Sequence, residues 1–237
     1  MTPVFVILET LAKLLLSPFL TYQALRVRKT ARRLPEPPGH RSGASGQGQP
    51  LTLLITGDSS AAGVGATHQT EALSGQLVQA LSTSYHVDWQ LVARTGNTTR
   101  TTLPLLRAQE AHPVDVAFVV LGVNDITSQI PLKRLLRQRE HLYAHLFNDW
   151  QAKRVIVAGI PPLRKFPLLP QPLRWFLGLQ ARRFDTALSQ QAQQMGVDYI
   201  PFDLPLTPEM MAEDGFHPGP NTYYLMGQTV AQRILHR

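Results

Sequence analysis

The sequence contains no cysteine, and this absence excludes disulfide bonds, cysteine-ligated zinc sites and catalysis by a thiol. The absence fits a reducing compartment but does not establish one. No internal repeat is evident in the 237 residues, of which 43% are hydrophobic and 16% are charged. This length and composition suffice for one globular domain with a sizeable core and an additional segment.

Several motifs of known chemistry are missing as well. The sequence has no phosphate-binding P-loop, and 63-GVGATH-68 lacks the last glycine of the dinucleotide-binding motif G-x-G-x-x-G. It has no G-x-S-x-G motif, which disfavours the common α/β-hydrolase arrangement. His141 and His145 have a spacing that metal ligands can use, but no third ligand is suggested. We therefore interpret both histidines as part of a solvated helix face and expect no metal site.

Positive charge is concentrated near the N-terminus. The chain has a formal net charge of +7, and residues 1–50, with seven Lys/Arg and two Asp/Glu, account for +5 of it. Residues 51–237 are nearly balanced at +2. Because the basic residues are confined to one segment and are not interleaved with a stacking platform, we expect no nucleic-acid partner.

The N-terminal segment, residues 1–34, contains the apolar run 4-VFVILETLAKLLLSPFL-20 and then a cationic cluster. Glu9, Lys13 and Ser17 are spaced by four, so they lie on one face of an amphipathic helix. The run is shorter than the ~20 residues that span a bilayer comfortably, and Pro18 would distort its end. A secretory signal peptide carries its positive charge before the apolar run, not after it. The cluster consists of Arg26, Arg28, Lys29, Arg32 and Arg33.

We interpret residues 4–33 as a helix in the membrane interface, with the basic cluster on anionic headgroups. One alternative is a spanning anchor, for which the positive-inside rule would place the main domain on the cytoplasmic side. The other is a helix packed on the domain or on another subunit. Residues 35–50 are rich in Pro, Gly and Ser and are predicted to be a flexible linker, which leaves residues 51–237 as the main domain.

The main domain alternates between strand-like and helix-like patterns. This alternation predicts a parallel five-stranded sheet with helices on both faces, in which ligands bind at the carboxyl ends of the strands. The apolar runs are nearly continuous, as in strands that are covered on both sides. The predicted strands are 51–55, 87–92, 116–121, 154–160 and 197–202, and the predicted helices are 71–84, 99–111, 131–151, 178–195 and 220–236.

Small and polar residues occupy the loops where a pocket should form. They are 57-GDSS-60, 93-ARTGNTT-99 and 122-GVND-125 after the first three strands, and 214-DGFHPGP-220 before the last helix. In the last loop Asp214 precedes His217 by three residues. An aspartate can orient an imidazole, which can then take a proton from a serine. Alternatively, Asp214 caps the helix and His217 has no such role.

Together these loops resemble the SGNH, or GDSL-type, hydrolase family over about residues 50–236. The G-D-S motif matches Gly57-Asp58-Ser59, with Ser60 in place of the usual Leu. The second motif contributes a glycine, best matched by Gly96, and the third, G-x-N-D, matches 122-GVND-125. The last, D-x-x-H, matches 214-DGFH-217. The resemblance implies a flavodoxin-like three-layer α/β/α sandwich and ester hydrolysis without a metal or an organic cofactor.

The resemblance also assigns roles to individual residues. Ser59 would be the nucleophile, His217 the base and later the acid, and Asp214 the residue that orients the imidazole. The oxyanion hole would consist of the Ser59 and Gly96 backbone N–H groups and the Asn124 side-chain amide. The implied activity is that of a serine ester hydrolase that forms an acyl-enzyme.

The sequence predicts the type of reaction more specifically than it predicts the substrate. Residues 160–178 are apolar and proline-rich, and we interpret them as a pocket wall or lid for an acyl chain; alternatively they pack on the domain or help to bind membrane. We expect a small-molecule or lipid acyl ester. A carbohydrate O-deacetylase or a thioesterase of the same fold is an alternative, as is a non-catalytic membrane-bound interaction module. The intact set of Ser59, Asn124, Asp214 and His217 argues against the module.

Overall fold

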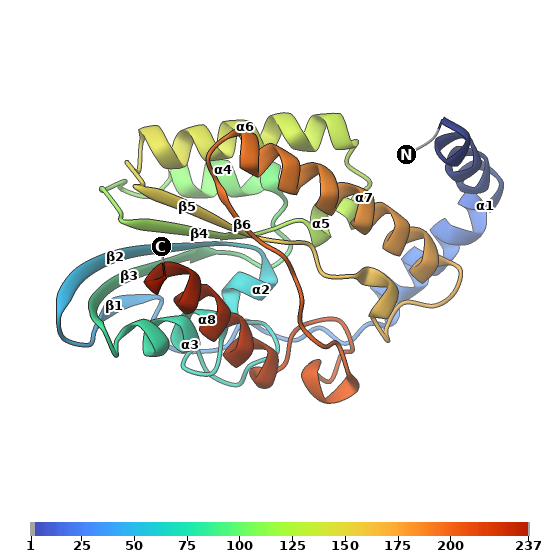
Figure 1. Cartoon of the computed structure of the whole chain (residues 1–237). Helices are drawn as coiled ribbons and strands as arrows, with labels where there is room; N and C mark the ends of the chain where they lie inside the picture. The colour runs from blue at the N-terminus through green and yellow to red at the C-terminus, as the bar shows by residue number, and fades with distance from the viewer. Residues whose placement is uncertain (1–2, 237) are drawn as a thin grey trace.

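A six-stranded sheet forms the centre of the fold, with helices on both faces (Figure 1). The computed structural model describes the backbone of residues 3–236 and the side chains of residues 15–236. The strand order is β1-β3-β2-β4-β5-β6, in which β2 to β6 run parallel to one another and β1 pairs antiparallel with β3. The predicted five parallel strands are therefore confirmed, in a flavodoxin-like order. The strands are β1 Ser42–Ser45, β2 Gln49–Gly57, β3 Tyr85–Ala93, β4 Val116–Val120, β5 Arg154–Ala158 and β6 Asp198–Ile200.

The helices form two layers, as the alternating pattern predicts. In β4, Val116, Phe118 and Val120 pack toward α3 and α8, whereas Ala117 and Val119 pack toward α4 and α6. Successive residues of a strand point to opposite faces, so a strand that is apolar at every position requires helices on both sides. The helices are α1 Pro3–Thr30, α2 Ser59–Ala62, α3 Leu73–Leu81, α4 Thr99–Arg107, α5 Val123–Thr127, α6 Leu132–Asn148, α7 Leu173–Gln194 and α8 Pro220–Leu235, with 3-10 turns η1 Leu163–Lys165 and η2 Pro208–Met210.

The prediction that residues 35–50 are a flexible linker is wrong. This segment contains β1 and the start of β2, and it is held to the sheet by side chains as well as by backbone pairing. The Glu36 carboxylate accepts hydrogen bonds from the Thr95 N–H and hydroxyl, and Arg41 donates to Glu36 and to the Ala93 carbonyl. The pairing satisfies N–H and C=O groups of the β3 edge that would otherwise have no partner in the sheet.

The N-terminal helix α1 is longer than the predicted apolar run, because it continues through Pro18 to Thr30. Its described part packs on α7: Leu20 and Gln23 are buried, and the Gln23 carboxamide donates to the Gln171 carbonyl and accepts from the Leu173 N–H at 2.7 and 3.1 Å. A helix that packs on the domain was one of the three alternatives left open by the sequence. Among the described residues, no helix combines the length and apolarity that crossing a bilayer requires.

Candidate active site

Ser59 lies at the carboxyl end of β2, in the first turn of the four-residue helix α2. Asp58 caps this helix, since its Oδ1 accepts a hydrogen bond of 3.0 Å from the Ser60 N–H. Gly57 allows the chain to pass close to β4: a Cβ at this position would lie 2.1 Å from the Val120 carbonyl oxygen. The strand exit is therefore tightly constrained, and the Ser59 hydroxyl is held at the edge of the sheet.

His217 lies on the loop before α8, and this loop is fixed by its own hydrogen bonds. The Asp214 Oδ1 accepts from the N–H groups of Phe216 and His217, at 2.9 and 3.0 Å. The other carboxylate oxygen lies 2.6 Å from His217 Nδ1. Asp214 thus contacts both the backbone and the ring of His217.

The structure brings these two loops together. His217 Nε2 lies 3.0 Å from Ser59 Oγ, although 158 positions separate the two residues in the chain. Two contacts near this point hold the loops in place. The Tyr223 hydroxyl of α8 donates to the Val64 carbonyl at 2.6 Å, and a Cβ at Gly65 would lie 2.3 Å from the Pro218 carbonyl oxygen. Serine, imidazole and carboxylate therefore form a continuous hydrogen-bonded chain that can move a proton off the serine.

The Asp214 carboxylate is almost completely buried, at 2% side-chain exposure, yet its pKa is lowered. Burial alone would raise this pKa, but the hydrogen bond with the His217 ring and the two backbone N–H donors outweigh it. Asp214 is therefore ionised at neutral pH. An ionised carboxylate at Nδ1 keeps Nε2 free to accept the serine proton and stabilises the imidazolium that results.

The predicted oxyanion-hole residues lie around Ser59 but are not equally placed. Asn124, on α5, lines the pocket, and its Nδ2 donates one hydrogen bond of 3.0 Å to the Asn97 carbonyl. Gly96 lies on the exposed β3–α4 loop with φ of +82° and does not line the pocket. That loop is tied beside Ser59, because the Asn97 amide donates to the Gly57 carbonyl at 3.3 Å. Within the described residues, the N–H groups of Ser59 and Gly96 have no hydrogen-bond acceptor.

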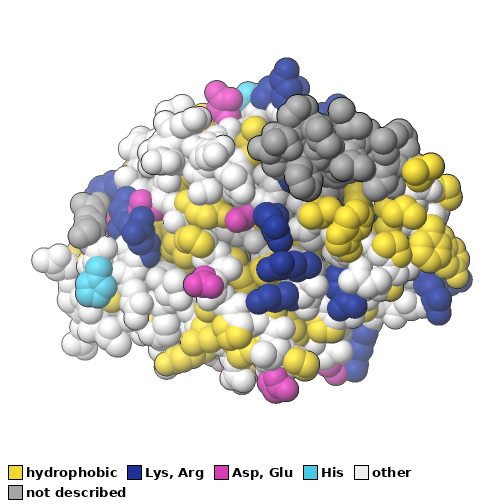
Figure 2. All heavy atoms as spheres, turned by 45° about the vertical axis from the view of Figure 1, so that its right-hand side comes forward, with side chains coloured by type: hydrophobic (Ala, Val, Ile, Leu, Met, Phe, Trp, Pro, Cys, Tyr) yellow, Lys and Arg dark blue, Asp and Glu magenta, His cyan; other side chains and the backbone are white. Residues whose placement is uncertain are grey.

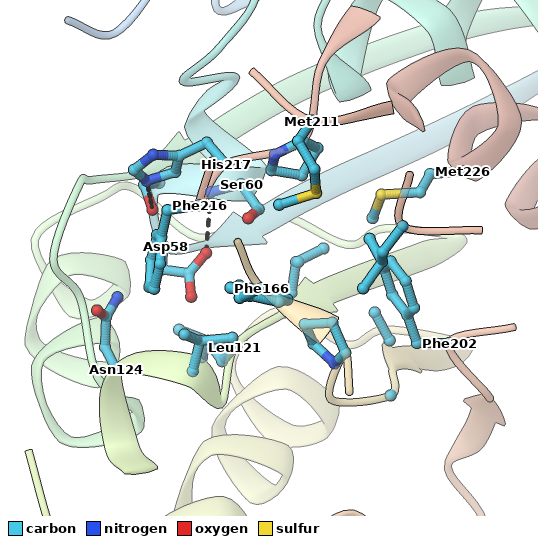
Figure 3. Close-up of a pocket in the computed structure, with 18 residues that line it drawn as sticks. Asp58, Ser60, Leu121, Asn124, Phe166, Phe202, Met211, Phe216, His217 and Met226 are labelled. Atoms are coloured by element: carbon cyan, nitrogen blue, oxygen red, sulfur yellow. Dashed lines mark hydrogen bonds between the residues drawn. The ribbon is translucent and has the colours of Figure 1, made fainter. Parts of the chain in front are cut away.

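A pocket opens at these groups, and most of its lining is apolar. In Figure 3, His217 and Asn124 lie at one end, and Phe202 and Met226 lie at the other. The pocket and its open mouth together contain about 640 Å³ of space that no atom occupies. Its shape and chemistry suit a ligand with a polar reacting group and an apolar body. The apolar lining residues are Val120, Leu121, Val123, Ala158, Pro161, Phe166, Phe202, Leu206, Met211, Phe216, Pro218 and Met226.

The proline-rich segment 160–178 contributes to this pocket through Pro161 and Phe166. The Phe166 ring packs edge-on against Phe216, with 5.3 Å between the ring centres, and the Leu168 N–H donates to the Gly215 carbonyl at 3.3 Å. The segment therefore forms a wall beside the histidine loop. Its last part is helical, because α7 begins at Leu173 rather than near residue 178.

One charged residue under the site was not predicted from the sequence. Arg139 on α6 is fully buried, and its guanidinium lies 3.8 Å from where a Cβ at Gly122 would be. Its positive charge opposes the effect of burial, which raises the pKa of Asp125, a residue that accepts two hydrogen bonds from Thr99. The burial of Arg139 could have been predicted from its position in the sequence. Arg139 lies four residues after Leu135 and three before Leu142, both of which are buried on the same helix face.

The interpretation of His145 as a solvated residue is wrong. His141 is exposed, but the His145 side chain is buried, and its Nδ1 lies 2.9 Å from the Asp149 carboxylate. The helix face that carries His145 also carries Leu142 and Leu146, and it packs against the sheet. In the part of the chain that the structure describes, no three side chains of the His, Asp or Glu type are grouped to hold a metal.

Comparison with known proteins points to ester hydrolases. A family model described as "GDSL-like Lipase/Acylhydrolase family" matches residues 55–225. No curated protein matches the sequence. Among solved structures, an acetylxylan esterase from Geobacillus stearothermophilus is 16% identical, with a TM-score of 0.58 over 80% of this chain and 96% of its own.

Two further solved structures share the fold at similar distances. A putative arylesterase from Agrobacterium tumefaciens str. C58 is 17% identical, with a TM-score of 0.59 over 78% of this chain and 98% of its own. An extracellular lipase from Streptomyces rimosus is 16% identical, with a TM-score of 0.59 over 77% of this chain and 99% of its own. The predicted three-layer architecture is thus confirmed by proteins of low sequence identity.

The buried Asp58 carboxylate makes stability depend on pH. Burial raises the pKa of Asp58 to about 6, although the Ser60 N–H and nearby positive charge oppose the shift. A raised carboxyl pKa favours the folded state while the group is protonated, so this contribution is present at about pH 4 and is lost as the pH rises through about 6. Asp58→Asn keeps the acceptor for Ser60 but carries no charge.

We compare the unfolding free energy of Asp58→Asn with that of the wild type at two pH values. We expect the difference in favour of Asp58→Asn to be up to about 3 kcal/mol larger at about pH 8 than at about pH 4. Urea unfolding at both pH values measures this difference. Asp88→Asn, at an exposed carboxylate, is the matched control for the loss of one negative charge. An Asp58→Asn effect of the same size at both pH values would contradict the prediction.

Proposed function

Because the chain belongs to the GDSL-like lipase/acylhydrolase family and is therefore a carboxylic ester hydrolase, we propose that Ser59, His217 and Asp214 form its catalytic triad. The observation that carries this proposal is the 3.0 Å contact between Ser59 Oγ and His217 Nε2, continued by the 2.6 Å contact between His217 Nδ1 and Asp214. The three groups have the order and the distances that nucleophilic catalysis by serine requires.

The reaction follows from this geometry. Ser59 Oγ attacks the ester carbonyl carbon while its proton passes to His217 Nε2, and the Asp214 carboxylate stabilises the imidazolium. The tetrahedral intermediate collapses, the alcohol leaves with the proton from Nε2, and the acyl group remains on Ser59. Water then attacks the acyl-enzyme with His217 again acting as base, which releases the carboxylic acid and restores the serine.

The negative charge on the tetrahedral oxygen requires donors that are already in place. The Ser59 and Gly96 N–H groups, which have no acceptor among the described residues, support this role. Asn124 has a second N–H besides the one bonded to Asn97, since a primary amide carries two donors. Fixed donors of this kind stabilise the transition state without having to reorganise during the reaction.

The apolar pocket supports acyl esters as the substrate class. A carbohydrate O-deacetylase is the second candidate, and the structural similarity to an acetylxylan esterase favours it. The two candidates differ in the acyl group, because an acetyl group would occupy only the part of the pocket next to Ser59. A non-catalytic interaction module would not require the hydrogen-bonded Ser59–His217–Asp214 chain.

The exposed face of α1 supports a position at a membrane surface. Leu15, Phe19, Tyr22 and Leu25 recur at helical spacing and are 81%, 50%, 58% and 60% exposed. On the side of the molecule that carries α1 and α7, hydrophobic side chains gather beside several Lys and Arg side chains (Figure 2). Apolar and basic groups together suit an interface with anionic headgroups, which are concentrated on cytoplasmic leaflets. The exposed basic residues that follow are Arg26, Arg28, Lys29 and Arg33.

Such a membrane position would lie close to the catalytic loop. Arg32, just after α1, forms an ion pair of 2.7 Å with Glu213, the residue before Asp214. The pair is exposed and contributes little to stability. It lies at the end of the N-terminal segment, beside the loop that carries Asp214. A lipid-like ester would therefore have a short path from the interface to the pocket.

Replacement of Ser59 tests the nucleophile. We expect the wild type to react with a fluorophosphonate probe and Ser59→Ala to lose this labelling completely, because the phosphonyl group bonds to the activated oxygen. Ser60 lines the same pocket one residue later, so Ser60→Ala is a matched control that should retain labelling. Full labelling of Ser59→Ala would show that another residue is the nucleophile.

Replacement of Asn124 tests the oxyanion hole. We expect Asn124→Ala to lower kcat for p-nitrophenyl butyrate by about 10²–10³, because one donor to the oxyanion is lost. Ser128→Ala, at an exposed position after the same short helix, should leave kcat unchanged. An Asn124→Ala protein that is folded and has wild-type kcat would remove Asn124 from the proposed site.

Replacement of Phe19 tests membrane association. We expect Phe19→Glu to reduce co-sedimentation with phosphatidylserine-containing vesicles by about tenfold, since it removes an aromatic side chain from the apolar face and adds a negative charge. Thr21→Glu adds the same charge at another exposed position of α1 and should have a much smaller effect. Equal sedimentation of Phe19→Glu, Thr21→Glu and the wild type would eliminate this face as the contact.

A further inference from the structure

A second pocket adjoins the one at Ser59. The two pockets share Ala158, Gly159, Phe202 and Met226, so they are direct neighbours. In Figure 3 the shared residues Phe202 and Met226 lie at the end of the first pocket that is remote from His217. The residues found only in the second are Phe118, Ile200, Pro201, Asp203, Leu204, Thr229 and Val230.

The second pocket lies between α8 and the segment that follows β6. Helix α8 contributes Met226, Thr229 and Val230 to its lining, and the segment after β6, which leads to η2 (Figure 1), contributes residues 201–204. In residues 200–206, half-buried apolar side chains alternate with exposed positions. An extended chain with this period of two presents its apolar side chains to one side. They are Ile200, Phe202, Leu204 and Leu206, and the exposed positions are Pro201, Asp203 and Pro205.

These side chains line both pockets along one strip. Leu206 lines the first pocket, Phe202 lines both, and Leu204 lines the second. Ile200, Phe202, Leu204 and Ala158 pack against the main core cluster, but they remain only partly buried. Apolar surface of this kind is stabilised when it is covered by an apolar ligand.

The lining of the second pocket is mainly apolar. Of its two polar side chains, Asp203 is solvent-exposed, and the Thr229 hydroxyl already donates to the Leu225 carbonyl at 2.9 Å. The other side chains there are hydrocarbon or aromatic. A ligand that begins at Ser59 and continues past Met226 must therefore be elongated and apolar.

Resting on the proposed function, we propose that the two pockets form one channel for the acyl chain, and that the preferred substrates are esters of medium or long acyl chains rather than acetyl esters. The carbonyl lies at Ser59, and the chain passes between Phe202 and Met226 toward Leu204 and Thr229. Each methylene that the channel covers in the transition state increases kcat/KM by up to about fourfold.

A chain-length series tests the channel. kcat/KM is measured for p-nitrophenyl acetate, butyrate, octanoate and laurate, below the concentrations at which they form micelles. For the wild type, kcat/KM rises at least tenfold from acetate to octanoate. Leu204→Trp places a large ring in the second pocket only, and it lowers the octanoate-to-acetate ratio at least fivefold relative to the wild type. A merely structural effect would lower both esters alike and leave the ratio unchanged.

Two further variants complete the test. Thr229→Trp, at an exposed position that also lines only the second pocket, lowers the same ratio and serves if Leu204→Trp does not fold. Leu235→Trp, at a partly buried position that packs on the same core but lines neither pocket, leaves the ratio unchanged. A wild type that is most active on acetate, or second-pocket variants with an unaltered ratio, would overturn the channel while the proposed triad stands. Absence of both turnover and fluorophosphonate labelling would overturn the proposed function, and the channel with it.

Discussion

The hydrogen bond between Ser59 Oγ and His217 Nε2 sets the strictest geometric requirement on the fold, because it joins two loops that are 158 positions apart in the sequence. A parallel sheet meets this requirement by placing strand exits at a common edge. Small residues then allow the final approach. Gly57 passes β4 and Gly65 passes Pro218 at distances that leave no room for a side chain. The Tyr223 hydroxyl, bonded to the Val64 carbonyl, fixes α8 against the serine loop. The site is therefore a product of backbone packing as much as of the polar side chains.

The buried carboxyl groups near this hydrogen bond differ in the direction of their pKa shifts, because burial and hydrogen bonding balance differently at each of them. Asp214 faces the His217 ring and two backbone N–H groups, and its pKa is lowered despite burial. Asp58, with one backbone donor, and Asp125, with two donors from Thr99, have raised pKa values because burial outweighs their hydrogen bonds. Only a carboxylate that stays ionised can keep the imidazole in the orientation that accepts a proton. Asp214 thus differs from its structural neighbours in that its hydrogen bonds outweigh burial, although all three carboxyl groups are buried.

Much of this architecture could be predicted from local patterns in the sequence, and the failures have a common cause. Apolar runs such as 116-VAFVV-120 identify the parallel strands because both of their faces are covered, and the loops around Ser59, Asn124 and His217 follow directly. The strand β1, 42-SGAS-45, has no apolar residue apart from Ala44, and it pairs because β3 has a free edge. The burial of Arg139 was not predicted, and His145 was wrongly interpreted as solvated. In both cases the burial of a helix face depends on what packs against it. The role proposed for Gly96 likewise depends on the geometry of the β3–α4 loop. One matching glycine in the sequence does not encode that geometry.

The attachment of α1 has a consequence for where the cooperative folding unit begins. Leu20 belongs to the same apolar cluster as Leu173 and Phe176, and Gln23 satisfies two backbone groups at the start of α7. Truncating the chain before the first parallel strand would expose that cluster and leave both groups without their protein partners. It would also strip β1 from the edge of β3. Deletion mapping of this chain would therefore mix lost stability with any lost membrane contact, and single surface substitutions are the cleaner means of dissecting it.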